Sequence, residues 1–153
     1  MKKKIVVGLL ATLIIMQFFR IDKTNPESDP KQSIFAVENV PADVEKLIKT
    51  SCFDCHSNQV TYPWYSNVAP VSWVVKDHIN EGREELNFSE WGTFTTKRKL
   101  HKLEEIEEEV GEGEMPLAGY LLIHGKARLK SSQQKILTNW AKELRTGEKI
   151  EEL

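Results

Sequence analysis

Cysteine is scarce in this chain, and a surplus of positive charge is absent. Two cysteines among 153 residues exclude a framework of several disulfide bonds. The chain has 21 Lys and Arg against 23 Asp and Glu, and the resulting net charge of −2 argues against a nucleic-acid partner. Neither an alternating strand pattern nor an internal repeat is visible. The composition, 40% hydrophobic and 29% charged, indicates one compact globular domain.

The N-terminus carries the longest hydrophobic run of the chain. Residues 1–20 contain Lys2–Lys4 and Arg20 but no Asp or Glu, and residues 5–19 are apolar at all but two positions. This pattern is typical of a secretory signal or a signal anchor. Because no small-x-small cleavage site follows, we expect residues 1–20 to stay attached as a transmembrane helix. The alternative is a domain that is secreted after signal cleavage.

The basic start sets the expected orientation of this helix. Lysines on the N-terminal side favour a cytoplasmic N-terminus. The chain is therefore expected to be a single-pass protein of the cell membrane, with its main domain outside, in the periplasm. The run spans roughly 22 Å as a helix, less than the hydrocarbon core of about 30 Å. Snorkelling lysines and local thinning of the bilayer can close this difference.

The rest of the sequence predicts a linker, a helical domain and a tail. Residues 21–39 have two prolines and no periodicity, which indicates a linker. Residues 40–147 show the apolar i, i+3, i+4 spacing of helices, and residues 148–153 form the tail. The expected fold class is all-α. Helices are expected to begin at Pro41, to cover 71–86 and 89–110, and to run from Ser131 to Gly147, with Gln134 as the capping-box residue of the last.

The motif that carries chemistry is Cys-x-x-Cys-His at residues 52–56. This spacing is the attachment site of c-type haem. On a helical turn the sulfurs of Cys52 and Cys55 lie on one side, where each thiol can add across one haem vinyl group to form a thioether. His56 then reaches the iron as an axial ligand. The motif therefore predicts one covalent haem c, and its attachment outside the cytoplasm agrees with the export signal.

The cysteine pair has three other interpretations. A thioredoxin-like redox pair belongs in a βαβ pattern, which is absent. A structural zinc site needs four ligands, and the other histidines are scattered along the chain. A structural disulfide leaves the adjacent histidine unexplained. We therefore favour haem.

The second axial ligand is predicted to be Met115. It is the only methionine beyond the N-terminal run, and Pro116 favours an extended backbone that suits a ligand presented from a loop. Methionine paired with histidine is the ligand arrangement of electron-transfer haems. His124 is the main alternative, followed by His78 and His101.

Five blocks of sequence extend the motif. They are 51–58 (SCFDCHSN), 62–65 (YPWY), 69–73 (APVSW), 87–91 (NFSEW) and 115–124 (MPLAGYLLIH). Together they resemble the bacterial haem-binding domain family, which is cytochrome c-like, over residues 38–145. The resemblance implies covalent haem at Cys52 and Cys55 and iron ligation by His56. It also implies ligation by Met115, which matches the family's methionine–proline position.

The aromatic loop after the motif is expected to wall the haem on the His56 side. Trp64 and Pro70 are the residues that we expect to pack against it. The carbonyl of Pro63 or of Pro70 is a candidate acceptor for the ring N–H of His56, because such groups orient axial histidines.

Three functions are compatible with these residues. An iron held by His56 and Met115 has no open position for a substrate, which favours a membrane-anchored electron carrier that acts with an unidentified redox partner protein. An open or displaceable distal position would instead make an enzyme or a sensor of peroxide or a gas. Without haem, a non-haem metal or thiol module remains.

Overall fold

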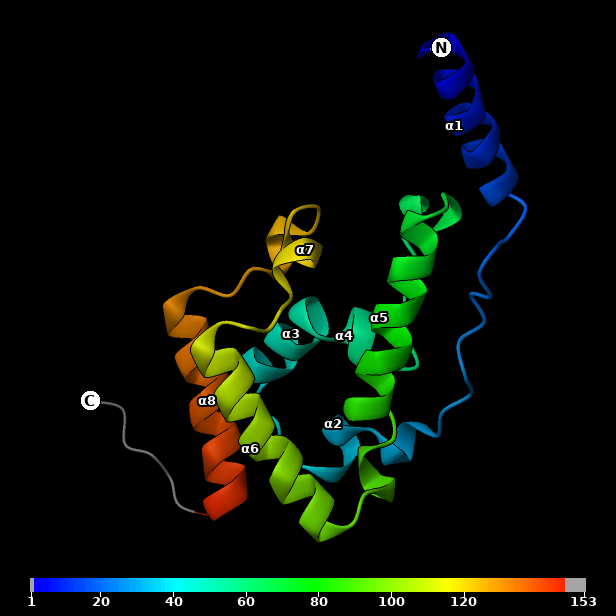
Figure 1. Ribbon diagram of the computed structural model, residues 1–153. Helices are drawn as coiled ribbons and strands as arrows, with labels where there is room; N and C mark the ends of the chain where they lie inside the picture. The colour runs from blue at the N-terminus through cyan, green and yellow to red at the C-terminus, as the bar shows by residue number, and fades with distance from the viewer. Residues whose placement is uncertain (1, 148–153) are drawn as a thin grey trace.

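The computed structural model describes residues 2–147, and these residues form helices and no strand (Figure 1). The predicted all-α fold is confirmed for them, whereas the predicted tail, 148–153, lies outside them. The helices are α1 (Lys2–Met16), α2 (Ile34–Val37), α3 (Ala42–Ser51), α4 (Phe53–His56), α5 (Val71–Glu85), α6 (Thr96–Glu112), α7 (Ala118–Leu121) and α8 (Ser131–Thr146). Short 3-10 turns lie between them: η1 (Pro30–Gln32), η2 (Trp64–Asn67), η3 (Trp91–Thr93) and η4 (Gly125–Ala127).

Helix α6 starts later than the sequence predicts. The expected start was Ser89, but a turn and η3 occupy this stretch. The side chain of Thr95 caps the helix by accepting the N–H of Arg98 at 3.3 Å. At the other end, Gly113 has a φ of 81°, a left-handed conformation that glycine adopts readily.

Helix α8 starts at Ser131 as predicted, but its capping residue differs. The side chain of Gln133, not Gln134, accepts the N–H of Lys130 at 2.9 Å. Gln134 instead donates to the carbonyl of Val110 on α6 at 3.2 Å. It therefore joins α8 to α6, which lie side by side.

The predicted linker contributes to the core. It contains η1 and α2, and Ile34 in α2 has no exposed surface. The N–H of Ile34 also donates to the carbonyl of Phe88 at 2.9 Å. The packed domain therefore begins before residue 40. The sequence did not predict this, because a helix of four residues is too short to show periodicity.

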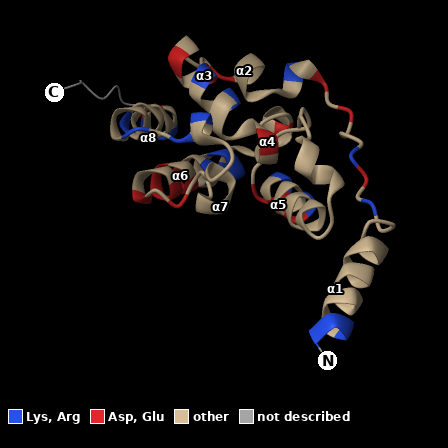
Figure 2. Ribbon diagram, turned by 90° about the horizontal axis from the view of Figure 1, so that it is seen from above, with Lys and Arg blue, Asp and Glu red and all other residues tan. Residues whose placement is uncertain are grey.

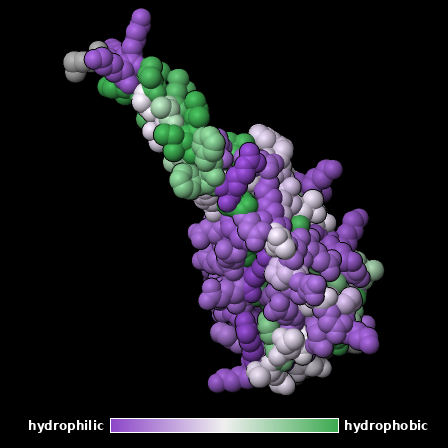
Figure 3. Space-filling view, turned by 90° about the vertical axis from the view of Figure 1, so that its right-hand side faces the viewer, coloured by the Kyte–Doolittle hydropathy of each residue, from purple (hydrophilic) through white to green (hydrophobic). Residues whose placement is uncertain are grey.

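Helix α1 projects from the domain (Figures 1 and 3). None of its residues is buried, and its apolar side chains are exposed. Among residues 2–147, no helix is both long enough and apolar enough to cross a membrane, which leaves the predicted transmembrane anchor unsupported.

Candidate functional site

The Cys-x-x-Cys-His segment forms a helical turn where α3 meets α4. Cys52 ends α3 and precedes α4, and the backbone N–H groups of Cys55 and His56 donate to its carbonyl at 3.2 and 2.9 Å. Both cysteines are free thiols. Cys52 and His56 line a large cavity, whereas Cys55 lies against α5 and is not part of the cavity wall. The structure thus places the three motif residues on one turn but only two of them in the cavity.

Burial keeps both thiols protonated. It raises the pKa of Cys52 to about 12, with a contribution from Cys55, and the pKa of Cys55 to about 11, with a contribution from the charge of Asp54. A thioredoxin-like pair needs a thiolate with a lowered pKa, so these surroundings argue against that interpretation. The zinc alternative lacks a ligand set, because among residues 2–147 no three His, Cys, Asp or Glu side chains are grouped to hold a metal.

His56 is oriented by the C-terminal end of α5. Its Nδ1 donates to the carbonyl oxygens of Gly82 at 2.8 Å and Leu86 at 3.0 Å. The predicted acceptors, Pro63 or Pro70, are wrong: their carbonyls accept within their own turns, from Ser66 and Trp73, and Nδ1 of His56 lies against the end of α5 instead. Nothing in the sequence marks a backbone acceptor. With Nδ1 acting as a donor, Nε2 is the nitrogen left to bind iron.

The protonation state of His56 suits metal ligation. Burial lowers the pKa of His56, while the hydrogen bonds to Leu86 and Gly82 oppose this effect. A lowered pKa favours neutral imidazole, which is the form that binds a metal.

Gly82 permits the close approach of α5 to the motif. A Cβ on Gly82 would lie 2.9 Å from the carbonyl oxygen of Cys55 and 3.1 Å from its Cβ, which is too close for undistorted packing. Further along the chain, the N–H of Phe88 donates to the carbonyl of His56 at 2.8 Å. Both contacts fix α5 and the segment after it to the motif.

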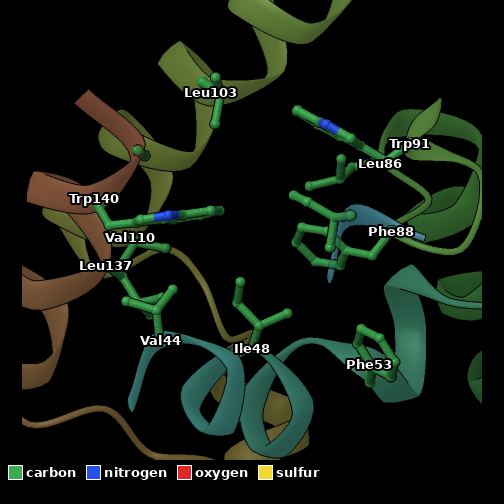
Figure 4. Close-up of a cluster of buried hydrophobic side chains, with 12 residues drawn as sticks. Val44, Ile48, Phe53, Leu86, Phe88, Trp91, Leu103, Val110, Leu137 and Trp140 are labelled. Atoms are coloured by element: carbon green, nitrogen blue, oxygen red, sulfur yellow. The ribbon is translucent and has the colours of Figure 1, made fainter. Parts of the chain in front are cut away.

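An apolar cavity of about 290 Å³ opens beside His56. Protein interiors are close-packed and contain few voids larger than a water molecule, so a cavity of this size is a candidate ligand site. Figure 4 shows the apolar side chains around it, and the indole of Trp140 extends from α8 toward Leu86 and Phe88 on the opposite side. The apolar part of the wall is formed by Ile48, Leu86, Phe88, Ile106, Val110 and Leu137, and Glu85, Glu105 and Glu109 also line the cavity.

Trp140 supplies a second indication that this cavity suits a ligand. Its Nε1 is buried without a hydrogen-bond partner, and the residue lines the cavity. A buried donor without an acceptor is costly. A ligand that is largely apolar but carries an acceptor, such as a porphyrin with carboxylate groups, fits this environment.

Met115 lines the same cavity from the loop that follows α6. After Gly113 the chain turns back, and the N–H of Met115 donates to the carbonyl of Glu109 at 3.0 Å. The Met115 side chain is half-buried and packs against the hydrophobic core. The thioether that the sequence predicts as a ligand and the imidazole of His56 therefore share one cavity.

The three other histidines lie outside the cavity wall. His124 stacks on the ring of Tyr120, with centroids 4.0 Å apart, and its Nε2 lies 3.3 Å from the hydroxyl of Tyr65. His101 is exposed on α6, and His78 is half-buried on α5.

Trp64 and Pro70, the residues expected to pack against haem, are both exposed, and neither lines the cavity. The aromatic loop lies instead on the outer side of the motif, where Tyr65 contacts His124. The sequence marks this loop as aromatic but does not say which of its side chains face inward. The cavity wall is supplied by α3, α4, α5, α6 and α8 and by the segments that follow α5 and α6.

A model of the haem-binding domain family matches residues 11–143. The chain belongs to the haem-binding domain family. The resemblance stated from the sequence motifs is thereby confirmed, and the match extends into α1. No curated protein and no solved structure matches the chain. Membership of this family identifies a haem-binding protein. The residues that line the cavity beside His56 are compatible with haem.

Proposed function

We propose that this chain is an exported electron carrier with one covalent haem c. Cys52 and Cys55 would hold the haem through thioether bonds, and His56 and Met115 would be the two axial ligands of the iron. When bound, the haem supplies a one-electron redox centre. The observation that carries the proposal is that His56 and Met115 line the same apolar cavity next to Cys52.

The chemistry of attachment fits the state of the thiols. In forming a thioether, the sulfur and the proton of one S–H group add to the two carbons of one vinyl group, so no oxidant is needed. Both cysteines are half-buried free thiols on one turn, and their raised pKa values keep them protonated. The unpaired Nε1 of Trp140 is positioned as a donor to a haem carboxylate.

Two protein ligands favour electron transfer over catalysis. If His56 and Met115 both bind iron, no position is left for a substrate. A thioether ligand also raises the reduction potential of haem iron. An enzyme or sensor would require Met115 to leave the iron.

Export and membrane attachment are part of the proposal. Haem of the c type is attached outside the cytoplasm, which agrees with the basic and apolar residues 1–20. Because α1 exposes apolar side chains on all sides and buries none of them, we propose that it holds the protein at the membrane.

Covalent attachment is tested by denaturing electrophoresis of protein matured in a host with haem-ligation machinery. We expect haem staining to migrate with the wild-type chain and to disappear in the double variant Cys52→Ala, Cys55→Ala. Ferrous wild-type protein should not bind carbon monoxide, because both axial positions are filled. A colourless wild-type protein would contradict haem attachment. Rapid binding of carbon monoxide would favour the enzyme or sensor.

A further inference from the structure

Exposed apolar side chains gather in two segments of the domain. Beyond residue 19, all but two of the exposed large hydrophobic residues in the described chain lie in residues 64–74 and 117–123. The most exposed are Leu122 (85%), Trp64 (76%) and Ile123 (63%). Apolar surface of this kind, when contiguous, marks an interaction site.

The two segments form one surface, which we term the apolar end (residues 64–74 and 117–123). The hydroxyl of Tyr65 in η2 lies 3.3 Å from Nε2 of His124, the residue that directly follows the second segment. The rings of Tyr65 and His124 also meet edge to face, with centroids 5.9 Å apart. The loop after α7 and the turn before α5 are therefore neighbours in space.

Helix α1 leaves the molecule from this same end. The side-chain amide of Gln17 accepts from the backbone N–H of Ala69 and donates to its carbonyl, both at 3.0 Å. Nε1 of Trp73 donates to the carbonyl of Phe19 at 2.9 Å. Figure 1 shows α7, the start of α5 and the base of α1 at one level, with α1 extending beyond them. The apolar surface of α1 is thus continued by the apolar end.

The apolar end carries no charged side chain of its own, and charges of both signs border it, because Asp77 adjoins Lys76 and Asp54 accepts a hydrogen bond from Tyr120. The chain has 23 Asp and Glu, but none of them lies in residues 1–21, 55–76 or 115–130. Figure 2, which looks onto this end, shows acidic residues on α4 as well as along α6, and the one on α4 is Asp54. Lys76 and Lys126 lie at the edge of the apolar end. An uncharged apolar surface next to an exposed apolar helix suits the apolar part of a lipid layer.

We infer that the apolar end rests on a lipid surface. Trp64, Leu122 and Ile123 would enter the interfacial layer, the depth that tryptophan favours, beside the inserted α1. The inference rests on the proposed membrane attachment and adds to it a fixed orientation of the domain. Because the hydroxyl of Tyr120 donates to Asp54 at 2.7 Å, this orientation turns the Cys-x-x-Cys-His turn toward the membrane.

The test uses the full-length, haem-loaded protein with one added cysteine for an environment-sensitive fluorophore. Leu122→Cys reports on the apolar end. Leu100→Cys is the matched control, because Leu100 is an exposed leucine on α6, outside the apolar end. The probe is a vesicle of phosphatidylcholine and phosphatidylglycerol. Wild-type protein measures background labelling of the native cysteines, and flotation with the vesicles is recorded in parallel.

We expect the label at position 122 to shift its emission to shorter wavelength and to be quenched by doxyl-labelled lipid, while the label at position 100 keeps its aqueous spectrum. Flotation without a shift at position 122 would overturn the inference and leave attachment by α1 intact. Absence of flotation would overturn both. A shift at position 122 that requires added membrane proteins would overturn the lipid surface in favour of a protein partner. The haem spectrum of the same samples reports separately on haem binding.

Discussion

The two sides of the cavity are built differently. On the His56 side, two backbone carbonyls hold the imidazole, and α5 lies so close to the motif that Gly82 has no room for a Cβ. On the Met115 side, the side chain is carried by a loop, and the backbone N–H of Met115 is fixed by one hydrogen bond to the carbonyl of Glu109.

This difference indicates a rigid side and an adaptable side of one site. A ligand locked by several contacts tolerates little change around it. A flexible thioether on a loop can adjust its position. Substitutions on the His56 side should therefore disrupt the whole site. Substitutions elsewhere should leave the site formed and change one property of it, such as its stability.

Replacement of the rigid ligand itself should have the largest effect. In His56→Ala the imidazole that the α5 carbonyls orient is lost, and we expect the yield of haem-loaded protein to fall more than about tenfold. Haem absorbance per mole of protein measures this yield. His101→Ala removes an exposed histidine of α6 and should behave as wild type. A wild-type spectrum in His56→Ala would show that another residue is the ligand.

Crowding of the rigid side should have the next largest effect. In Gly82→Ala the new methyl group meets the carbonyl of Cys55 at 2.9 Å, and we expect a loss of about 1–3 kcal/mol in the free energy of unfolding. Gly111→Ala is the control, because its nearest neighbour, Cγ2 of Thr138, lies 3.8 Å away. Within α6 this change should raise stability by about 0.5–1 kcal/mol. Equal denaturation midpoints for both variants would contradict the close approach of α5.

The contact that joins the two sides should have a smaller effect. Tyr120, which follows Met115 in the chain, donates to Asp54 in the motif at 2.7 Å, and Tyr120→Phe should cost about 1 kcal/mol in the free energy of unfolding. Burial, followed by the bond to Asp54, raises the pKa of Tyr120. The contribution of Tyr120 to the free energy of unfolding should be fully present below pH about 10, the ordinary pKa of tyrosine. It should be lost as the pH rises through the higher pKa that Tyr120 has in the folded protein.

Denaturant titrations of wild type and Tyr120→Phe at pH 8 and above pH 10 test this prediction. The control is Tyr62→Phe, because the buried hydroxyl of Tyr62 has no hydrogen-bond partner and its removal should not destabilise the fold. If Tyr120→Phe and Tyr62→Phe have the same stability, the bridge between the two sides contributes nothing.

A loss of similar size is expected at Trp140, but only when haem is bound. In the haem-free protein, Trp140→Phe removes an unpaired donor, so no hydrogen bond is lost. In the haem-loaded protein it should remove a bond to a haem carboxylate and cost about 1 kcal/mol more. Comparing the two forms cancels the change in packing. Equal losses of stability in both forms would refute the role of Nε1.

Sequence spacing predicts the part of the site whose residues are neighbours in the chain. The spacing of Cys52, Cys55 and His56 predicts a haem-attachment motif, and their position on one helical turn agrees with this prediction. The acceptors of His56 could not be predicted, because backbone carbonyls have no side-chain signature. Gly82 likewise looks like an ordinary helical glycine until α4 is packed against it.

In the fold, too, the sequence predicts the features that neighbouring residues encode and misses those that depend on distant contacts. Helices α5 and α8 are long and have clear apolar faces, and they begin where the sequence predicts. The burial of Ile34 depends on a contact with Phe88, far along the chain, which no local pattern encodes. The prediction that Trp64 packs against haem was wrong, because an aromatic side chain is equally compatible with a haem wall and with an exposed surface.

The central claim is that His56 and Met115 bind one haem iron from within the same cavity. Its most direct test is the ferric absorption spectrum of wild type, Met115→Ala and the control Met16→Ala, whose methionine lies in α1. We expect the sulfur-to-iron charge-transfer band in wild type and in Met16→Ala, and its loss in Met115→Ala together with binding of carbon monoxide to the reduced protein. Absence of the band from wild type, or its persistence in Met115→Ala, would contradict the claim.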